Sequence, residues 1–399
     1  MLSLLRPSPT LTGQDVTRSL RTMVWEGVAS TVMFSLGSGG LMAAYALALG
    51  ANNLQVGLLA ALPFLSQVLQ IPAILAVERF RLRKAIGVPA LLASHLMWVP
   101  IGAVPFLLET PGAMAVTAAI VLMAIRGVFA PAWASTWTSW MRDLVPREIM
   151  GAYYGRRQAL MTGAVAVVGL AASFVISWWE GRAPADDAIL VYSYLLIAGV
   201  IVLGLPSVFL AARTSEPLMP AALETDRSAF ALLLEPWRDK NFSQLLRFLF
   251  FWNLVLFLAF PFFVVYMLTE LGLALPIVIG FTALSLITNV MFVTVWGGMA
   301  DRLGSKTVLS LSASLYLLVI LGWAFVGNAE PRWFMLSMLA VLHVFVGIAA
   351  AGVTLTTGTI AFKVAPEGKA TPFLGAASIA TFVGAGVGQV LARSDERRL

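Results

Sequence analysis

The sequence contains no cysteine and only two histidines among its 399 residues. The absence of cysteine excludes disulfide bonds, thiolate metal sites and cysteine nucleophiles. The histidines, His95 and His343, lie far apart in the sequence, so we expect no histidine-rich metal site. No ATP-binding motif and no set of catalytic residues stands out either. We therefore predict a protein that is not an enzyme and that holds neither a metal nor a cofactor.

Charged residues are also scarce, because they make up 12% of the chain, about half of the usual share in soluble proteins. Hydrophobic residues make up 59%, and apolar runs of about 20 residues, the length that crosses a bilayer, recur from end to end. Transmembrane β-strands are shorter and alternate in polarity, so the pattern predicts an all-α polytopic membrane protein. The net charge of +6 fits an excess of basic residues in cytoplasmic loops better than nucleic-acid binding.

The apolar runs predict eleven membrane spans. The spans lie near residues 24–48, 54–77, 87–108, 113–140, 158–179, 189–212, 242–268, 275–299, 307–327, 333–361 and 370–392. The longest polar interruption follows the sixth span and is too short to bury a core of its own. We therefore predict a six-helix bundle over residues 1–213, a cytoplasmic linker over 214–240 and a second bundle of five spans over 241–399.

The basic residues of the short loops predict which end of each span lies in the cytoplasm. With a cytoplasmic N-terminus, the inner loops hold twelve of them and the outer loops only two, Arg182 and Arg332. The twelve are Arg79, Arg81, Arg83, Lys84, Arg142, Arg147, Arg156, Arg157, Arg302, Lys306, Lys363 and Lys369. An odd number of spans places the basic tail "RSDERRL" outside, against the same rule. Either the last run does not fully cross the membrane, or a twelfth helix is missing from the second of two pseudo-symmetric six-helix bundles. We favour a missing helix, because the eleventh run is of full length.

Two loops repeat each other across the halves. The loop after the second span of the C-terminal half reads "GGMADRLGSK", and its N-terminal counterpart reads "LAVERFRLRK". Glu78-Arg79 stands in the place of Asp301-Arg302. Asp301 lies at a predicted helix end, where a carboxylate caps backbone N–H groups, and Gly304 allows a tight turn with positive φ.

The loop of the C-terminal half, "GGMADRLGSK", resembles the signature G-x-L-A-D-R-x-G-R-K of the major facilitator superfamily, with Met299 for leucine and Ser305 for arginine. Leu122-x-x-x-Arg126 is similar to the superfamily's fourth-helix signature, and "DLVPREIMGAYYGRR", which starts at Asp143, looks like its loop between helices four and five. The resemblance implies a secondary active or facilitative transporter that works by alternating access. It fits a bacterial inner membrane or another membrane that faces the cytoplasm. Two departures are the lost glycines of the N-terminal loop and a fifth span without the Gly-Pro pair typical of drug–proton antiporters.

Charged groups at the inner face are expected to latch one half against the other and to separate when the halves rock. We assign this gating role to Glu26, Glu78, Arg79, Asp143, Asp301, Arg302, Gly304 and Lys306. The alternative is that these basic residues only anchor the loops on the cytoplasmic side.

Arg126 lies about midway along the fourth span, where burying a guanidinium costs roughly 2.5–3.5 kcal/mol by insertion scales. Trp133, Trp137 and Trp140 follow at helical spacing on the same arc, and Pro131 is expected to bend the helix. A deep cation beside flat aromatic rings suits an anionic or aromatic solute. Two alternatives remain: Arg126 pairs with a structural carboxylate, and the tryptophans, Trp140 above all, are interfacial anchors.

The resemblance further implies that spans one, four, seven and ten line the solute cavity. The predicted solute-binding residues are Arg126, Trp133, Trp137, Asn253, His343 and Thr354. For His343 the alternative is a packing residue within the bundle.

The leading prediction is a transporter that moves a small solute across a lipid bilayer by alternating access. A second interpretation is an assembly factor or subunit that no longer transports and binds a membrane-protein partner. The absent twelfth helix and the degenerate first loop motivate this alternative.

Overall fold

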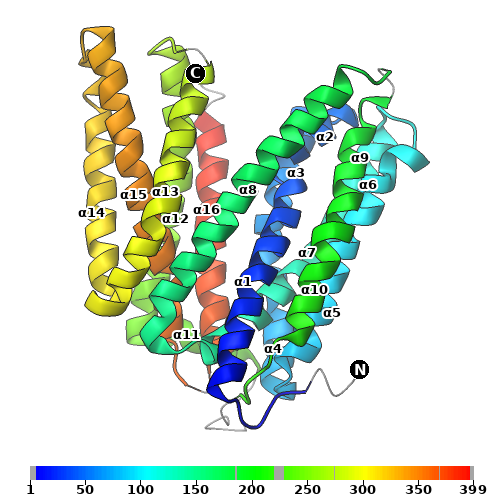
Figure 1. Ribbon diagram of the computed structural model, residues 1–399, viewed down its shortest axis with the longest axis vertical. Helices are drawn as coiled ribbons and strands as arrows, with labels where there is room; N and C mark the ends of the chain where they lie inside the picture. The colour runs from blue at the N-terminus through cyan, green and yellow to red at the C-terminus, as the bar shows by residue number, and fades with distance from the viewer. Residues whose placement is uncertain (1–5, 185–186, 220–228, 274, 368, 396–399) are drawn as a thin grey trace. The chain divides into compact units, whose positions relative to one another are not determined.

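A computed structural model describes residues 6–184, 187–219, 229–273, 275–367 and 369–395 (Figure 1). Within these ranges the chain is helical, and the described residues outside the helices form one isolated bridge, between Ser8 and Pro217. Eleven helical segments of the described chain are long and apolar enough to cross a membrane. They begin with Gly13–Ala48 and end with Ala370–Gly388, which confirms the predicted all-α polytopic fold and its eleven spans.

Several spans of the N-terminal half consist of two helical pieces. The first span is α1 (Gly13–Leu36) and α2 (Gly39–Ala48), the second α3 (Asn53–Leu65) and α4 (Gln70–Phe80), and the third α5 (Arg83–Leu96) and α6 (Trp98–Leu107). The fourth is α7 (Ala113–Leu144) and the fifth α8 (Met150–Glu180). The sixth is α9 (Leu190–Gly199) and α10 (Leu205–Arg213), joined by a π-turn over Val200–Gly204.

The linker contains α11 (Ala229–Arg238), and the spans after it are continuous helices. They are α12 (Lys240–Thr269), α13 (Leu275–Leu303), α14 (Ser305–Trp323), α15 (Arg332–Val364) and α16 (Ala370–Asp395). Membrane helices must pair their backbone groups internally, so a break within a span needs a local compensation or a role. The breaks in the spans of the N-terminal half are therefore candidate positions for a solute-binding site.

Backbone contacts divide the chain into two compact units. Unit 1 comprises residues 1–144, 163–243 and 366–382, and unit 2 comprises residues 145–162, 244–365 and 383–399. The boundaries pass through α8 and α16, so the start of α16 belongs with α4 and α7, and the start of α8 belongs with α13. The predicted division into bundles 1–213 and 241–399 with a linker between them stays a prediction.

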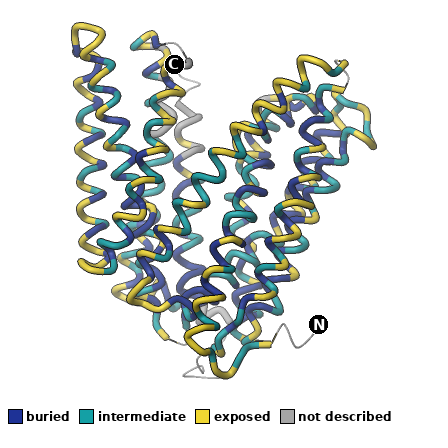
Figure 2. Tube along the Cα trace, viewed as in Figure 1, coloured by how far each residue is buried: buried dark blue, intermediate teal, exposed yellow. Residues whose placement is uncertain are grey.

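Each unit has its own apolar core. In unit 1 the core gathers Met33, Tyr45, Trp98, Met123 and Tyr192 from four spans, and the Tyr45 hydroxyl donates to the carbonyl of Ile101 at 2.6 Å. In unit 2 the core includes Trp323, Leu339 and Leu342. Leu170 and Phe174 of α8 are about three-quarters exposed, and Figure 2 shows further exposed positions along α8 and α14. Exposed apolar surface of this extent is expected to face lipid.

Candidate solute site and inner gate

Arg126 lies on α7 inside unit 1 and is 5% exposed. Its guanidinium carbon lies 4.4 Å from the centre of the Trp98 ring and 5.3 Å from that of Phe34, both within cation–π range. Among the described residues it makes no hydrogen bond and no ion pair, and of its three guanidinium nitrogens only Nε is fully shielded. The expected alternative, a carboxylate partner, is therefore not found within the described chain.

Two residues near Arg126, namely Trp98 and His95, each have a buried ring nitrogen without a hydrogen-bond partner in the described chain. Trp98 is fully buried, and its Nε1 has no hydrogen-bond acceptor among the described residues. His95 Nε2 lies 3.0 Å from the Ser207 hydroxyl and 3.4 Å from that of Ser30, while Nδ1 has no partner in the described chain. Sequence reasoning missed His95 as a site residue, although an ionisable residue within an apolar span is a general signal of function.

The tryptophans that follow Arg126 on α7 lie among other elements. Trp133 packs against Val88, Leu91 and Ala211, and Trp137 is partly buried. Trp140 is fully buried, and its indole N–H donates to the carbonyl of Ser215 at 3.0 Å. Because an interfacial anchor faces headgroups, the anchor interpretation of Trp140 was wrong.

The remaining predicted solute-binding residues lie in unit 2. Asn253 donates its side-chain amide to the carbonyl of Leu249 one turn earlier, at 2.7 Å. His343 is buried, stacks on Phe281 with ring centres 5.0 Å apart, and has Nδ1 2.8 Å from the carbonyl of Leu339. These contacts are those of a packing residue, as the alternative for His343 expected. Thr354 lies exposed on α15.

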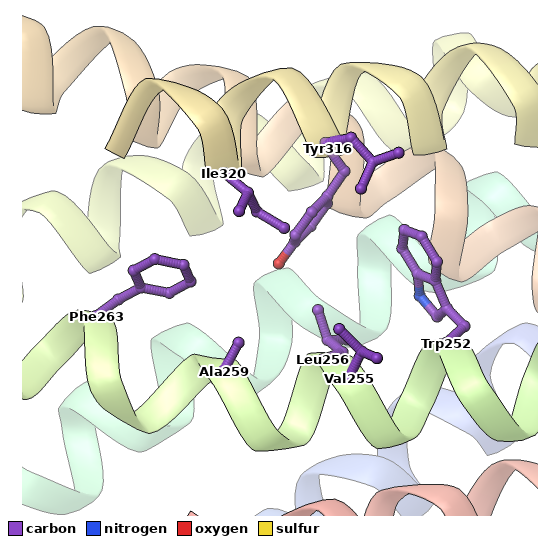
Figure 3. A pocket seen from close by; sticks show the side chains of 8 residues that line it. Trp252, Val255, Leu256, Ala259, Phe263, Tyr316 and Ile320 are labelled. Carbon is purple, nitrogen blue, oxygen red and sulfur yellow. The ribbon is translucent and has the colours of Figure 1, made fainter. Parts of the chain in front are cut away.

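Unit 2 also contains an apolar pocket between α12 and α14 (Figure 3). Its cavity volume is about 50 Å³, and it is lined by Trp252, Val255, Leu256, Ala259, Phe263, Tyr316, Leu317 and Ile320. The Tyr316 hydroxyl points toward the pocket from α14. None of the predicted site residues lines this pocket, and its surface does not suit a charged solute.

At the inner end of unit 2, Asp301 caps the start of α8. Its two carboxylate oxygens each accept one backbone hydrogen bond, from Gly151 N–H and Ala152 N–H, both at 2.7 Å. The ammonium of Lys363, at the end of α15, lies 3.6 Å away. A carboxylate at a helix N-terminus is stabilised by both the hydrogen bonds and the helix dipole.

The turn predicted for the loop between α13 and α14 is present at Gly304. Gly304 has φ of +89°, which confirms the expected turn with positive φ. Arg302 and Lys306 are exposed on either side of it.

At the inner end of unit 1, Glu78 takes the corresponding place. Its carboxylate lies 3.5 Å from the Arg81 guanidinium and near the hydroxyl of Thr371 at the start of α16, and its Oε1 has no hydrogen-bond partner in the described chain. The Thr371 hydroxyl lies 2.9 Å from that of Ser139 on α7. Sequence reasoning missed Thr371, because no local pattern indicates which helix start a loop carboxylate will meet.

Two further residues of the predicted gating set lie in unit 1 without joining this contact. Glu26 is buried on α1, and Arg79 is exposed with its guanidinium 5.6 Å from the ring of its neighbour Phe80. Neither position tests a gating role.

Arg83 holds the inner ends of unit 1 together and was counted in the sequence only as a loop charge. The side chain is fully buried, with Nη1 2.5 Å from Asp143 and Nε 3.2 Å from Glu216. It also donates to the carbonyls of Ser139 and Pro217, at 2.9 and 2.7 Å. Burial raises the pKa of the Glu216 carboxyl above its usual range, although the neighbouring Arg83 opposes the shift.

Eleven apolar helical segments in the described part of the chain define a multi-pass membrane protein. The chain belongs to the major facilitator superfamily, whose family profile it matches over residues 27–389. No curated protein matches the sequence significantly.

Solved transporter structures share the fold. The proton:xylose symporter XylE is 14% identical, with a TM-score of 0.63, 97% of this chain covered and 90% of that chain. FucP in the outward conformation, a major facilitator superfamily transporter, is 14% identical, with a TM-score of 0.67 and coverages of 96% and 91%. The human organic anion transporter MFSD10 is 14% identical, with a TM-score of 0.59 and coverages of 95% and 93%. At this identity the likeness to these structures shows the fold alone. Membership of the superfamily supports transport of a small solute across a membrane.

Proposed function

We propose that the protein moves a small solute carrying a negative charge or an aromatic ring, by alternating access, and that Arg126 binds it. The observation that carries this proposal is a buried guanidinium without a counter-ion in the described chain. Placing such a group at this depth costs roughly 2.5–3.5 kcal/mol by insertion scales. An anionic group of the solute offsets that cost by charge-assisted hydrogen bonds, and the Trp98 and Phe34 rings offer faces for stacking.

We infer that Trp133 and Trp137 in unit 1, and Asn253, His343 and Thr354 in unit 2, also contribute to solute binding. For Asn253 and His343 the contacts within their own helices are a competing use of the polar atoms. The structural relatives named above include a sugar symporter and an organic anion transporter, so the fold accommodates solutes of both kinds.

The gate in this proposal consists of two contacts, made at equivalent positions of the two loops. Asp301, near the end of α13, engages the start of α8, and Glu78, near the end of α4, engages the start of α16. Each contact joins a helix of the first six spans to a helix of the last five. Alternating access would require both contacts to separate. In this proposal Asp143, Arg302, Gly304 and Lys306 shape the loops around the two contacts.

Flux into reconstituted vesicles tests the function. We expect saturable uptake of a cognate solute that falls at least about tenfold in Arg126→Ala, the effect of losing one charge-assisted interaction of about 1.4 kcal/mol or more. Val128→Ala, at an exposed position on the same helix, serves as the matched control. Equal flux in both variants, with equal folding, contradicts the proposed role of Arg126.

We further propose that the protein lies in a bacterial inner membrane with its N-terminus in the cytoplasm. Because the chain has no cysteine, single cysteines placed in the loops report sidedness without background. A cysteine at Leu303, which is exposed, is expected to react with a membrane-impermeant reagent only from the cytoplasmic side, and one at Ala183 only from outside.

One of the two motives for the alternative function, a subunit or assembly factor that no longer transports, is the degenerate first loop. That loop keeps a turn with positive φ at Arg81, so its lost glycines give this alternative little support. Absence of flux, together with stable co-purification of one membrane protein, would favour it.

A further inference from the structure

The first span is broken at Gly37 and Ser38, between α1 and α2. Gly37 is buried against the six-membered ring of Trp98, which occupies the space that a Cβ atom at this position would need. Gly39, the first residue of α2, has φ of +58°. The close approach of Trp98 and the left-handed backbone explain why the sequence "GSGG" stands here, within an otherwise apolar run.

The break leaves the N-terminus of α2 open. The Ser38 side chain makes no capping hydrogen bond, and Gly39 and Gly40 are exposed, with no atom within 4 Å of their Cβ positions. The first backbone N–H groups of a helix have no partner within the helix, and they carry its positive dipole end. In membrane transporters, interrupted helices commonly direct such ends at anionic groups of the substrate.

Arg126 reaches the same break from α7. Its guanidinium lies over Phe34, in the last turn of α1, and over Trp98, which packs on Gly37. Arg126 and Trp98 are both more than nine-tenths buried, and Arg126 Nε and Trp98 Nε1 have no partner in the described chain. A second positive group and unused donors thus lie against Phe34 and Trp98, the two rings next to the α1–α2 break.

We propose that the α1–α2 break and Arg126 together form an oxyanion site, which takes a carboxylate or phosphate group of the solute. The N–H groups of α2 and the guanidinium are donors of the kind that binds such groups. This inference rests on the proposed transport function, because it assigns the charged end of the transported solute to one place in the fold.

Two substitutions of Ser38 test the site without weakening the helix. Aspartate and asparagine are equally good N-caps, so Ser38→Asp and Ser38→Asn should fold at least as well as the parent. Only Ser38→Asp adds a negative charge that competes with an oxyanion. We expect acetate, benzoate or phosphate to stabilise the purified full chain thermally, and the uncharged acetamide and benzamide to have no effect.

The affinity for the effective anion should fall about tenfold or more in Ser38→Asp and in Arg126→Gln, and should stay within about threefold of the parent in Ser38→Asn. Equal affinities of Ser38→Asp and Ser38→Asn for the anion would contradict the proposed oxyanion site. So would the finding that none of the three anions stabilises the protein. Flux of an uncharged solute that Arg126→Ala abolishes and Ser38→Asp leaves intact would keep the transport function and refute the oxyanion site. Anion binding with the expected Ser38→Asp loss, but without flux of any solute, would keep the site and refute transport.

Discussion

Arg81 and Gly304 occupy equivalent positions of the two inner loops and both have positive φ, 57° and 89°. Their ψ angles differ: Arg81 is left-handed helical with ψ of 28°, whereas Gly304 has ψ of 144°. A residue with a side chain tolerates the first conformation at a modest cost, but the second is open essentially to glycine alone. The N-terminal loop could therefore lose its glycine and keep its turn.

Gly304→Ala should consequently destabilise the protein by about 1–3 kcal/mol, the usual cost of such strain. Arg81→Gly should change stability by less than about 1 kcal/mol, because relief of the left-handed backbone is offset by the lost Glu78 contact. Thermal unfolding of both variants in detergent measures the difference. An alanine at 304 that leaves the midpoint unchanged contradicts this account of the loop.

The helices α8 and α13 approach each other through Gly151 and Gly297. A Cβ atom on either glycine would overlap the backbone carbonyl oxygen of the other, so neither helix can yield by rotating a side chain. Gly297→Ala should cost about 1–3 kcal/mol, as overpacking does, and should slow transport. Gly298→Ala is the matched control, since its Cβ would meet no atom within 4 Å. Equal stability of the two alanine variants would show that the close approach is dispensable.

Asp301 is predicted to act through its charge as well as its hydrogen bonds. Asp301→Ala leaves the Gly151 and Ala152 N–H groups uncapped and should destabilise the protein by about 1 kcal/mol. Transport should fall more than this loss of stability explains if the contact forms part of the gate. Vesicle flux, normalised to folded protein, measures the effect, and Asp301→Asn separates the charge from the side-chain size. Unchanged flux in folded Asp301→Ala would leave the residue a helix cap and nothing more.

Arg83→Met should be severely destabilising, by about 3–5 kcal/mol, because it leaves the Glu216 carboxylate buried without its cation. The double variant Arg83→Met/Glu216→Gln should recover much of this loss, and the thermal midpoints of the four proteins give the coupling energy. Additive effects of the two substitutions would contradict the coupling.

The same pair predicts a pH dependence. The pKa of Glu216 is already raised by burial, and removal of Arg83 takes away an interaction that opposes this rise. Because the folded state then binds the proton more tightly than the unfolded state, the stability of Arg83→Met should increase as pH falls from neutral toward the usual glutamate pKa of about 4.3. Arg83→Met/Glu216→Gln should lack this increase when its melting temperature is followed over the same range.

The sequence by itself determined the membrane class, the eleven spans, the family and the turn at Gly304. Each of these depends on local properties: the length and polarity of a run, and a loop signature with one glycine that the backbone requires. The predicted sidedness follows from a local excess of basic residues in the same way. Such local properties can be determined from the order of the residues alone.

Only the tertiary structure decided what the charged and aromatic side chains do. Trp140 reads as an interfacial anchor by position but is buried against Ser215, and Arg83 reads as a loop charge but joins Asp143 and Glu216. The rings beneath Arg126 come from α1 and α6, which no spacing on its own helix could reveal. The physical reason is that the partners of a buried polar group come from distant segments of the chain. Which segments come into contact depends on how the helices pack, whereas the hydropathy of a span depends only on its own residues.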